Sequence, residues 1–240
     1  MRASVPRRQL VWGLTGVLAG ACARSRPPPG PPLPRPMLRP SQAEETLARL
    51  EAAEPDSFKM VHQVVAKYGE RQHAMTGYVL ARRDGSFRVS AAASLGPRLF
   101  DVVRLRGKWD ARVHLTQLAE KLDPRHIGRA VERIYLVGAR GPLIAEEGYW
   151  LQRAEVAGEE DFDRVELLRD DSTMALAGKR FFRGQERSLE VHYDRLERVQ
   201  SHWLARRVRL KDERGFEIAL NVTEYVPGFP VPDEKLRLGA

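Results

Sequence analysis

Cysteine is almost absent from this chain: its 240 residues include a single one, Cys22. A lone cysteine excludes an internal disulfide framework and a C-x-x-C pair, so a folded domain has to be held by its hydrophobic core. Long apolar runs are missing as well. The apolar part of the uncharged stretch 9–21 is about half of the roughly 20 residues that a membrane-spanning helix needs. The sequence therefore predicts no transmembrane helix.

The motifs that usually mark an enzyme are missing too. The sequence has no G-x-S-x-G elbow, no H-E-x-x-H motif and no glycine-rich phosphate loop. No histidine lies three or four residues from another, as in a helical metal pair, so we expect polar strand or surface roles for all six. A hydrolase needs a nucleophile near a base, and only Ser94 or Ser188 with His192 come close in sequence. We therefore predict no enzyme activity, no catalytic residue, no metal and no cofactor. The histidines are His62, His73, His114, His126, His192 and His202.

The excess of positive charge belongs to one end of the chain. The formal net charge is +8, from 40 basic and 32 acidic residues. Residues 1–40 contain seven arginines and no acidic residue, so residues 41–240 carry only about one net positive charge. A nucleic-acid-binding domain carries its basic residues on the folded part. We therefore expect no nucleic-acid partner.

The N-terminal segment has the pattern of an export signal. Arginines at positions 2, 7 and 8 precede the apolar stretch, and small residues lead directly into Cys22. This resembles the lipobox of bacterial lipoproteins, which implies that residues 1–21 are a signal peptide and that Cys22 carries the acyl chains. Ala23 is not the aspartate that retains lipoproteins in the inner membrane of many Gram-negative bacteria. The resemblance implies an outer-membrane anchor with the domain facing the periplasm; plain secretion with a leftover thiol is the alternative.

Proline dominates the segment that follows the cysteine. Residues 23–40, ARSRPPPGPPLPRPMLRP, cannot form a helix or an inner strand, because proline lacks the backbone donor and fixes its own torsion. Such a segment favours polyproline II and spans roughly 50 Å at about 3.1 Å per residue. We expect residues 22–40 to be a lipidated cysteine and its tether, and residues 41–240 to be one folded domain. A proline-rich docking ligand is the alternative for the tether.

Strand patterns dominate the domain. Alternating apolar and polar residues over Phe216–Val226, and the Asp84-Gly85 turn signal, indicate antiparallel strands and hairpins. Apolar residues show no clear periodicity over 139–162, so no element is predicted there. About ten strands are expected, at Lys59–Tyr68, Gln72–Arg82, Ser86–Ala93, Leu99–Arg106, Lys108–Leu115, Arg164–Arg169, Thr173–Phe182, Ser188–Tyr193, His202–Leu210 and Phe216–Val226.

Two helices are expected. Ser41 with Glu44 has capping-box spacing and begins a short helix that ends near Glu54. Asp123 and Pro124 begin a second helix of about 14 residues. One face of the second helix is apolar, at Ile127, Val131, Ile134 and Tyr135.

These patterns predict a mainly β fold with some α: a single antiparallel, strongly curved sheet that forms an open barrel with a helical lid. A sheet that curves without closing leaves a hollow, and the apolar face of the second helix would cover it. Either helix and sheet make a dry core, or the hollow holds acyl chains. A cavity for acyl chains needs no catalytic residue, because each buried methylene contributes about 0.8 kcal/mol.

The segment 88–106, RVSAAASLGPRLFDVVRLR, resembles the strand–turn–strand region of the LolB family of outer-membrane lipoprotein receptors. The order of lipidated cysteine, helix, strands, turn and helical lid is similar as well. The resemblance implies a LolA/LolB-like open barrel that receives lipoproteins from a periplasmic LolA-like carrier and inserts them in the outer membrane. It also implies that Leu95 protrudes as a membrane or lipoprotein contact, although Ser94 replaces the family's usual proline. The alternative for Leu95 is a turn residue that folds back onto the core.

The functional prediction is an outer-membrane-anchored, monomeric periplasmic lipoprotein whose cavity binds acyl chains or lipoprotein lipid moieties. In that role Cys22 is the anchor in outer-membrane lipids, Leu95 the contact, and the apolar face of the second helix the lid. The alternative is a structural or protein-interaction lipoprotein of the cell envelope with no bound ligand.

Overall fold

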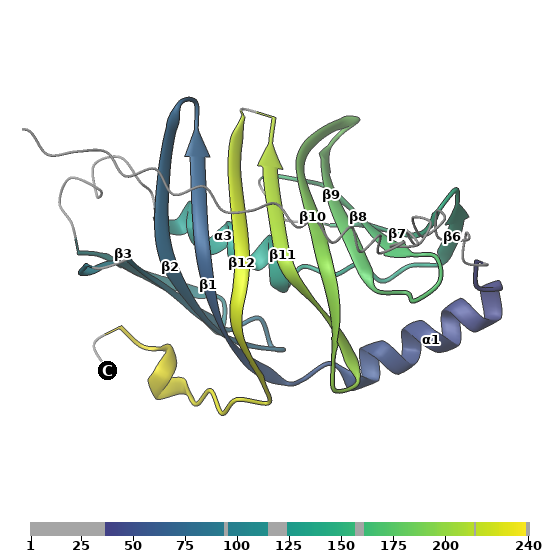
Figure 1. Cartoon of the computed structure of the whole chain (residues 1–240), viewed down its shortest axis with the longest axis horizontal. Coiled ribbons are helices and arrows are strands. Elements are labelled where there is room, and N and C mark those ends of the chain that lie inside the picture. Colours follow the sequence, from purple (N-terminus) through teal and green to yellow (C-terminus); the bar gives the residue numbers. More distant parts are fainter. Residues whose placement is uncertain (1–36, 94–95, 115–123, 157–160, 214, 239–240) are drawn as a thin grey trace, which may run out of the picture. The chain divides into compact units, whose positions relative to one another are not determined.

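The computed structural model describes residues 37–93, 96–114, 124–156, 161–213 and 215–238 (Figure 1). Within them the chain forms one antiparallel sheet of 12 strands. The helices are α1 (Pro40–Ala53), α3 (Pro124–Tyr135) and the short 3-10 helix η1 (Asp233–Leu236). The strands are β1 (Ser57–Tyr68), β2 (Arg71–Arg82), β3 (Phe87–Ala93), β4 (Arg98–Leu105), β5 (Lys108–Val113), β6 (Leu143–Glu146), β7 (Tyr149–Glu155), β8 (Arg164–Asp170), β9 (Leu176–Arg183), β10 (Glu186–Val199), β11 (His202–Asp212) and β12 (Phe216–Pro227).

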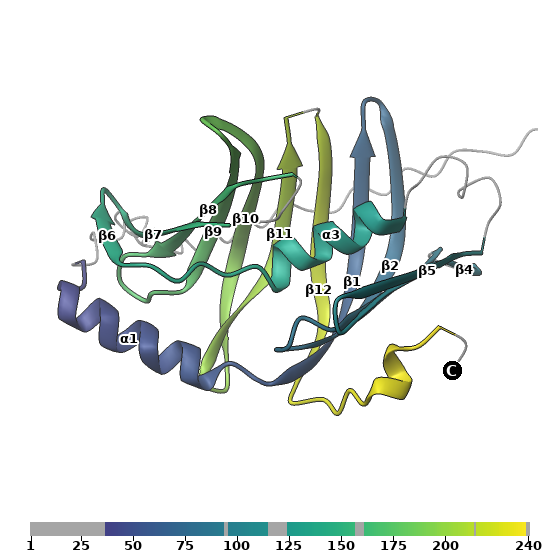
Figure 2. The ribbon, with the colours of Figure 1, turned by 180° about the vertical axis from the view of Figure 1, so that it is seen from behind.

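Two runs of neighbouring strands make up the sheet. Strands β1 to β5 form one run and β6 to β12 form the other, and the ladder between β1 and β12 joins them. Strands β5 and β6 are the two edges, and no described residue pairs one with the other, so the sheet stays open. The sheet curves, and α3 crosses its concave face (Figure 2). This confirms the predicted fold class.

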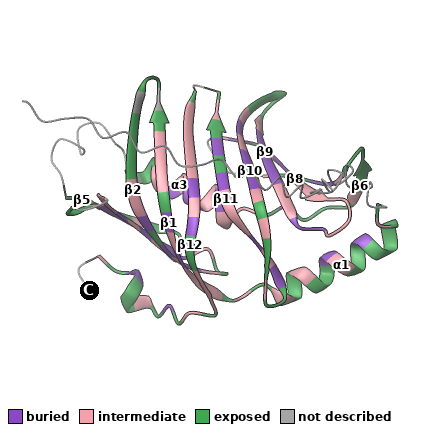
Figure 3. Cartoon of the chain, in the orientation of Figure 1, coloured by how far each residue is buried: buried purple, intermediate pink, exposed green. Residues whose placement is uncertain are grey.

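Apolar side chains of the strands form two main clusters that α3 connects. One cluster lies mainly on β1 to β4 and contains Phe87 and, from α3, Val131. The other lies mainly on β8 to β12 and contains Phe181 and, from α3, Ile134. Buried positions recur along the strands that carry these clusters (Figure 3). The helix therefore packs against both halves of the sheet.

The structure corrects the expected strand count, because it contains 12 strands in the described residues rather than about ten. The two unpredicted strands, β6 and β7, fall in the segment 139–162. Residues 150–152 of β7 are all buried, so this strand shows no alternation in its sequence. The strand expected from Thr173 begins only at Leu176, because the Asp170 carboxylate accepts hydrogen bonds from the backbone and hydroxyl of Thr173 and forms a turn.

The start of α1 also differs from the expected capping box at Ser41 and Glu44. The helix begins at Pro40, and the backbone N–H of Arg39 donates to the Gln42 side-chain oxygen at 3.1 Å. Proline suits the first helical position because its missing donor has no intrahelical partner there. No helix in the described part of the chain is long and apolar enough to cross a membrane.

Candidate functional site

The N-terminal half of helix α3 lies close to the sheet. A Cβ atom placed on Gly128 would come within 2.3 Å of the Trp109 ring and 3.0 Å of Val102. Glycine is thus required here by space, since no larger residue fits against β4 and β5 at this separation. The close approach fixes one end of the helix on the concave face.

The four residues of the predicted lid face all lie on the side of α3 that meets the sheet. Ile127 and Val131 pack in the cluster on β1 to β4, whereas Ile134 packs in the cluster on β8 to β12. Tyr135 contacts both clusters and is partly buried. Of the four, Ile134 and Tyr135 also line a cavity. The structure therefore places two of these side chains at the cavity and two in the adjoining core.

Two side chains from the sheet bind the C-terminal end of α3. The Lys179 ammonium donates to the backbone carbonyls of Arg133 and Ile134 at 3.0 Å and of Val137 at 2.6 Å. The Tyr193 hydroxyl donates to the carbonyl of Ile134 at 2.5 Å. The last carbonyls of a helix have no intrahelical donors, and a cation there also interacts favourably with the helix dipole. This end of α3 is therefore capped by β9 and β10.

The Lys179 side chain is unusual because it is 3% exposed and has no carboxylate within 4 Å among the described residues. Burial is the main cause that lowers the pKa of Lys179 to about 7, and the nearby charge of Arg169 acts in the same direction. The more distant Glu54 carboxylate acts in the opposite direction. The C-terminal end of α3 is thus bound by a buried amine that has no counter-ion within 4 Å among the described residues.

A second buried contact joins α3 to β1. The Tyr135 hydroxyl lies 2.6 Å from Nε2 of His62, whose side chain is almost completely buried. Burial lowers the pKa of His62 to about 4 and raises the pKa of Tyr135. Both groups are therefore uncharged at neutral pH, and the phenol can donate to the imidazole. His62 lies on a strand, as one of the two expected roles has it, but it is buried and not at the surface.

Ion pairs connect the outer face of α3 to β4 and to the loop between β7 and β8. Glu132 pairs with Arg104 of β4, and Arg129 and Arg133 both bind Asp161, which lies between β7 and β8. Burial alone would raise the pKa of Asp161, but the two arginines hold it below its usual value. Helix α3 is thus attached to both halves of the sheet by polar as well as apolar contacts.

An inner cavity of about 310 Å³ lies beside the C-terminal end of α3. Its polar lining includes His202, whose Nε2 atom is buried without a hydrogen-bond partner. Burial also lowers the pKa of His202, so its ring is neutral. The apolar lining comes from α1, α3 and strands β1 and β8 to β11, through Leu50, Phe58, Met60, Ile134, Leu167, Leu176, Leu196, Leu204 and Val208. A mostly apolar hollow with a few polar groups is typical of a ligand site.

A second cavity of about 420 Å³, which we call the vestibule, adjoins the inner cavity and is far more polar. The two cavities have six lining residues in common: Glu54, Arg83, Leu136, Gly138, Leu167 and Arg169. The vestibule adds Glu51, Ala139 and Arg140. Charged side chains therefore surround one side of the inner cavity.

The other predicted site residues do not form part of these cavities. Cys22, Ser94 and Leu95 lie outside the described residues. Ser188 and His192 are four residues apart on β10, about 13 Å along a strand, so this pair cannot act as nucleophile and base. The described residues contain no group of three or more histidine, cysteine or acidic side chains that could hold a metal ion.

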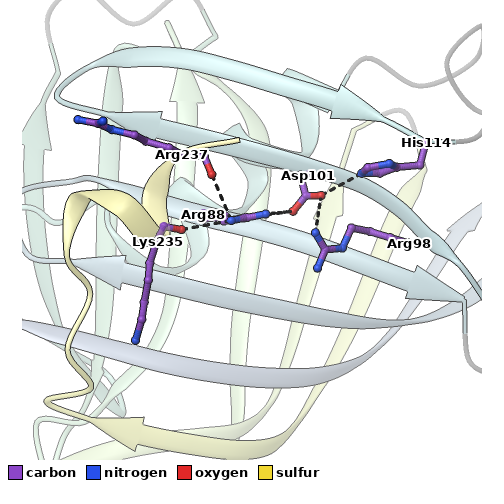
Figure 4. Close-up of polar contacts among 6 residues, drawn as sticks. All are labelled: Arg88, Arg98, Asp101, His114, Lys235 and Arg237. Atoms are coloured by element: carbon purple, nitrogen blue, oxygen red, sulfur yellow. Dashed lines mark hydrogen bonds and ion pairs between the residues drawn. The ribbon is translucent and has the colours of Figure 1, made fainter. Parts of the chain in front are cut away.

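A charged cluster centred on Asp101 connects strands β3 and β4 with His114, the residue that follows β5 (Figure 4). Asp101 on β4 is 2% exposed and accepts hydrogen bonds from Arg88 at 2.9 Å, Arg98 at 3.2 Å and His114 at 3.0 Å. Burial alone would raise the pKa of Asp101, but hydrogen bonds from His114 and Arg88 and the arginine charges hold it below its usual value. These contacts join β3, β4 and the residue that follows β5.

The same cluster attaches the C-terminal segment. Nη1 of Arg88 donates to the backbone carbonyls of Lys235 and Arg237, each at 3.3 Å (Figure 4). Leu236, between them, is completely buried in a small apolar cluster with Val103. The Asp101 cluster therefore has a structural role in the described residues.

Sequence reasoning missed Lys179, Tyr193, Arg169 and His62. Lys179 lies two residues before buried Phe181 on β9 and therefore on the same face, so its inward position follows from the strand period. A lysine on the inward face of a strand is rare, which is why that position was not singled out.

Comparisons with known proteins find the same fold at low sequence identity. No protein-family model and no curated protein matches the chain. A LolA superfamily protein from Nitrosomonas europaea has a TM-score of 0.58 and 13% identity, over 81% of this chain and 97% of that one. An outer membrane lipoprotein-sorting protein domain from Vibrio parahaemolyticus has a TM-score of 0.54 and 10% identity, over 81% and 94%. A DUF1329 family protein from Desulfovibrio piger has a TM-score of 0.51 and 9% identity, over 82% and 95%. The chain therefore shares the fold of the LolA superfamily.

Proposed function

We propose that this protein binds acyl chains in the inner cavity and takes part in lipoprotein sorting in the cell envelope. One observation carries the proposal: the open sheet and α3 enclose a mostly apolar hollow of about 310 Å³. Cavities of this size fall within the range of ligand sites, and burial of each methylene contributes about 0.8 kcal/mol. The shared fold with a lipoprotein-sorting domain supports the same role. No catalytic group is needed for it.

The sequence supports the proposed location. In this proposal residues 1–21 are a signal peptide, Cys22 is acylated and inserted in the outer membrane, and residues 23–40 hold the domain on the periplasmic side. A LolA-like periplasmic carrier would deliver the lipoprotein, and Leu95 would contact the membrane or the incoming lipid. The lid role of α3 belongs to this proposal, because Ile134 and Tyr135 of this helix line the cavity.

Native mass spectrometry of the full-length protein in a compatible detergent tests acyl-chain binding. A non-covalent lipid that disappears under denaturing conditions supports the proposal, since the covalent chains on Cys22 would remain. Val208→Phe places a ring in the cavity, where Val208 is 1% exposed, and should reduce the bound fraction. Ala219→Phe adds the same ring on the other face of β12, next to inward-facing Leu220, and is the matched control.

Binding that is equal in the wild type and in a folded Val208→Phe variant would remove the inner cavity as the site. Absence of any bound or added acyl chain would favour the ligand-free structural lipoprotein. Thermal unfolding of both variants shows whether each retains the fold.

A further inference from the structure

We propose that the ligand is a single-chain amphiphile whose anionic head group, a carboxylate or a phosphate, binds Arg169 in the vestibule while its tail enters the inner cavity. This inference rests on the acyl-chain binding proposed above, and it specifies a free amphiphile as a ligand of the inner cavity. Its first support is continuity: Arg169 and Leu167 line both cavities, so a head group at Arg169 lies at the entrance of the apolar hollow.

The second support is the orientation of the Arg169 guanidinium. Its Nε donates to the side chain of Gln152 at 2.7 Å, and its Nη1 donates to the backbone carbonyl of Met174 at 3.2 Å. Both acceptors are neutral, and no carboxylate lies within 4 Å of Arg169 among the described residues. A guanidinium held in place in this way is ready to bind an oxyanion.

The third support is unbalanced charge. Burial lowers the pKa of Arg169, and the carboxylates of Glu51 and Glu54 offset this only from a distance. Lys179 adds a second buried cation near Arg169, again with no carboxylate within 4 Å among the described residues. Buried charges without counter-ions destabilise a protein, and an anion bound at Arg169 relieves that cost.

The other two arginines of the vestibule differ in their ionic partners. Arg83 is already occupied, because it lies 3.8 Å from Glu54, 3.9 Å from Asp56 and donates to the carbonyl of Glu51. Arg140 is exposed and has no ionic partner among the described residues. Arg169 and Arg140 are therefore the two arginines of the vestibule that have no carboxylate within 4 Å among the described residues.

Three probes distinguish the contribution of the tail to binding from that of the charge: dodecanoate, 1-dodecanol and inorganic phosphate. We titrate each into the full-length protein and measure occupancy by native mass spectrometry. Dodecanoate should bind about tenfold more tightly than 1-dodecanol, which is the range of one charge-assisted hydrogen bond. Inorganic phosphate should displace dodecanoate only weakly, because it lacks the tail.

Three substitutions test which residues produce the preference for dodecanoate over 1-dodecanol. Arg169→Gln should abolish the preference for dodecanoate and leave the affinity for 1-dodecanol unchanged. Arg140→Gln removes an exposed charge and should reduce the preference by a few fold without changing the thermal midpoint. Arg183→Gln makes the same charge change at an exposed position outside both cavities and should keep the full preference.

Equal binding of dodecanoate and 1-dodecanol to the wild type would overturn the head-group inference and leave acyl-chain binding standing. A preference that survives in Arg169→Gln would overturn it too; if that variant does not fold, an unchanged preference in Arg140→Gln has the same meaning. If inorganic phosphate competes as strongly as dodecanoate, the site binds anions without regard to a tail, and the inference of an amphiphile is wrong. If neither amphiphile binds the wild type, the proposed function itself fails.

Discussion

At the scale of single residues, buried polar side chains hold α3 beside the cavity. Lys179 and Tyr193 bind the last carbonyls of α3, and His62 contacts Tyr135. Each of these contacts replaces a hydrogen bond that water would otherwise provide. The position of α3 is therefore sensitive to the protonation of residues on three different strands.

His62 predicts an acid-sensitive fold. Its pKa is about 4 in the folded protein and about 6.5 when unfolded, so between these values the unfolded chain binds more protons. Stability is thus fully present above pH 6.5, and acidification to pH 4 should lower the free energy of unfolding by about 3 kcal/mol. Urea unfolding at several pH values measures this.

The control for this prediction is another histidine. His62→Gln should flatten the pH dependence between pH 4 and 6.5, whereas His192→Gln changes an exposed ring and should retain it. Equal pH dependence in the wild type and in His62→Gln would show that His62 is not the group that titrates.

At the scale of elements, the N-terminal half of α3 depends on the contact between Gly128 and Trp109. Glycine in a helix interior normally costs up to about 1 kcal/mol relative to alanine, so Gly→Ala usually stabilises. Here the Cβ would lie 2.3 Å from the Trp109 ring. The steric conflict should reverse the sign.

Gly128→Ala is therefore expected to destabilise the protein by about 1–3 kcal/mol, the usual range for overpacking. Trp109→Leu removes the conflicting ring, so the double variant should show favourable coupling between the two changes. Chemical unfolding of the two single variants and the double variant measures that coupling. Additive effects would mean that the helix moves away without strain.

The same elements show how far the sequence alone can lead. The alternation at Phe216–Val226 and the turn at Gly85, where φ is +82°, were sufficient for an open antiparallel sheet. Strand β7 could not be read, since residues 150–152 are buried in succession. The vestibule could not be foreseen either, because Arg140 and Arg169 are distant in sequence and only the folded sheet brings them together.

At the scale of the whole molecule, the function depends on where the domain is held. The proposal places it at the outer membrane through Cys22, with the open sheet facing the periplasm. Several acyl chains on one residue anchor a protein far more firmly than one chain does.

Cys22 should be the only acylated position. Labelled palmitate should enter the wild-type protein, and membrane fractionation should place that protein in the outer membrane. Cys22→Ala should incorporate no label, whereas Ser25→Ala, three residues further on, should be labelled normally. Retention of label in Cys22→Ala would exclude the proposed anchor.

Leu95 should matter for delivery and not for folding. Leu95→Glu is expected to lower the fraction of a reporter lipoprotein that reaches the outer membrane, because a charge resists contact with acyl chains. Ile144→Glu is the matched control, since Ile144 is an exposed aliphatic residue on edge strand β6. Undiminished delivery with Leu95→Glu, at unchanged stability, would remove Leu95 from the site.

The ladder between β1 and β12 has a further consequence for biosynthesis. Strand β1 precedes its partner β12 by the length of ten other strands, so one edge of β1 stays unpaired until β12 has been translated. Pairing across such a sequence distance is slow, and unpaired edges attract other chains. A chaperone that acts during export would therefore have β1 as its first strand to protect.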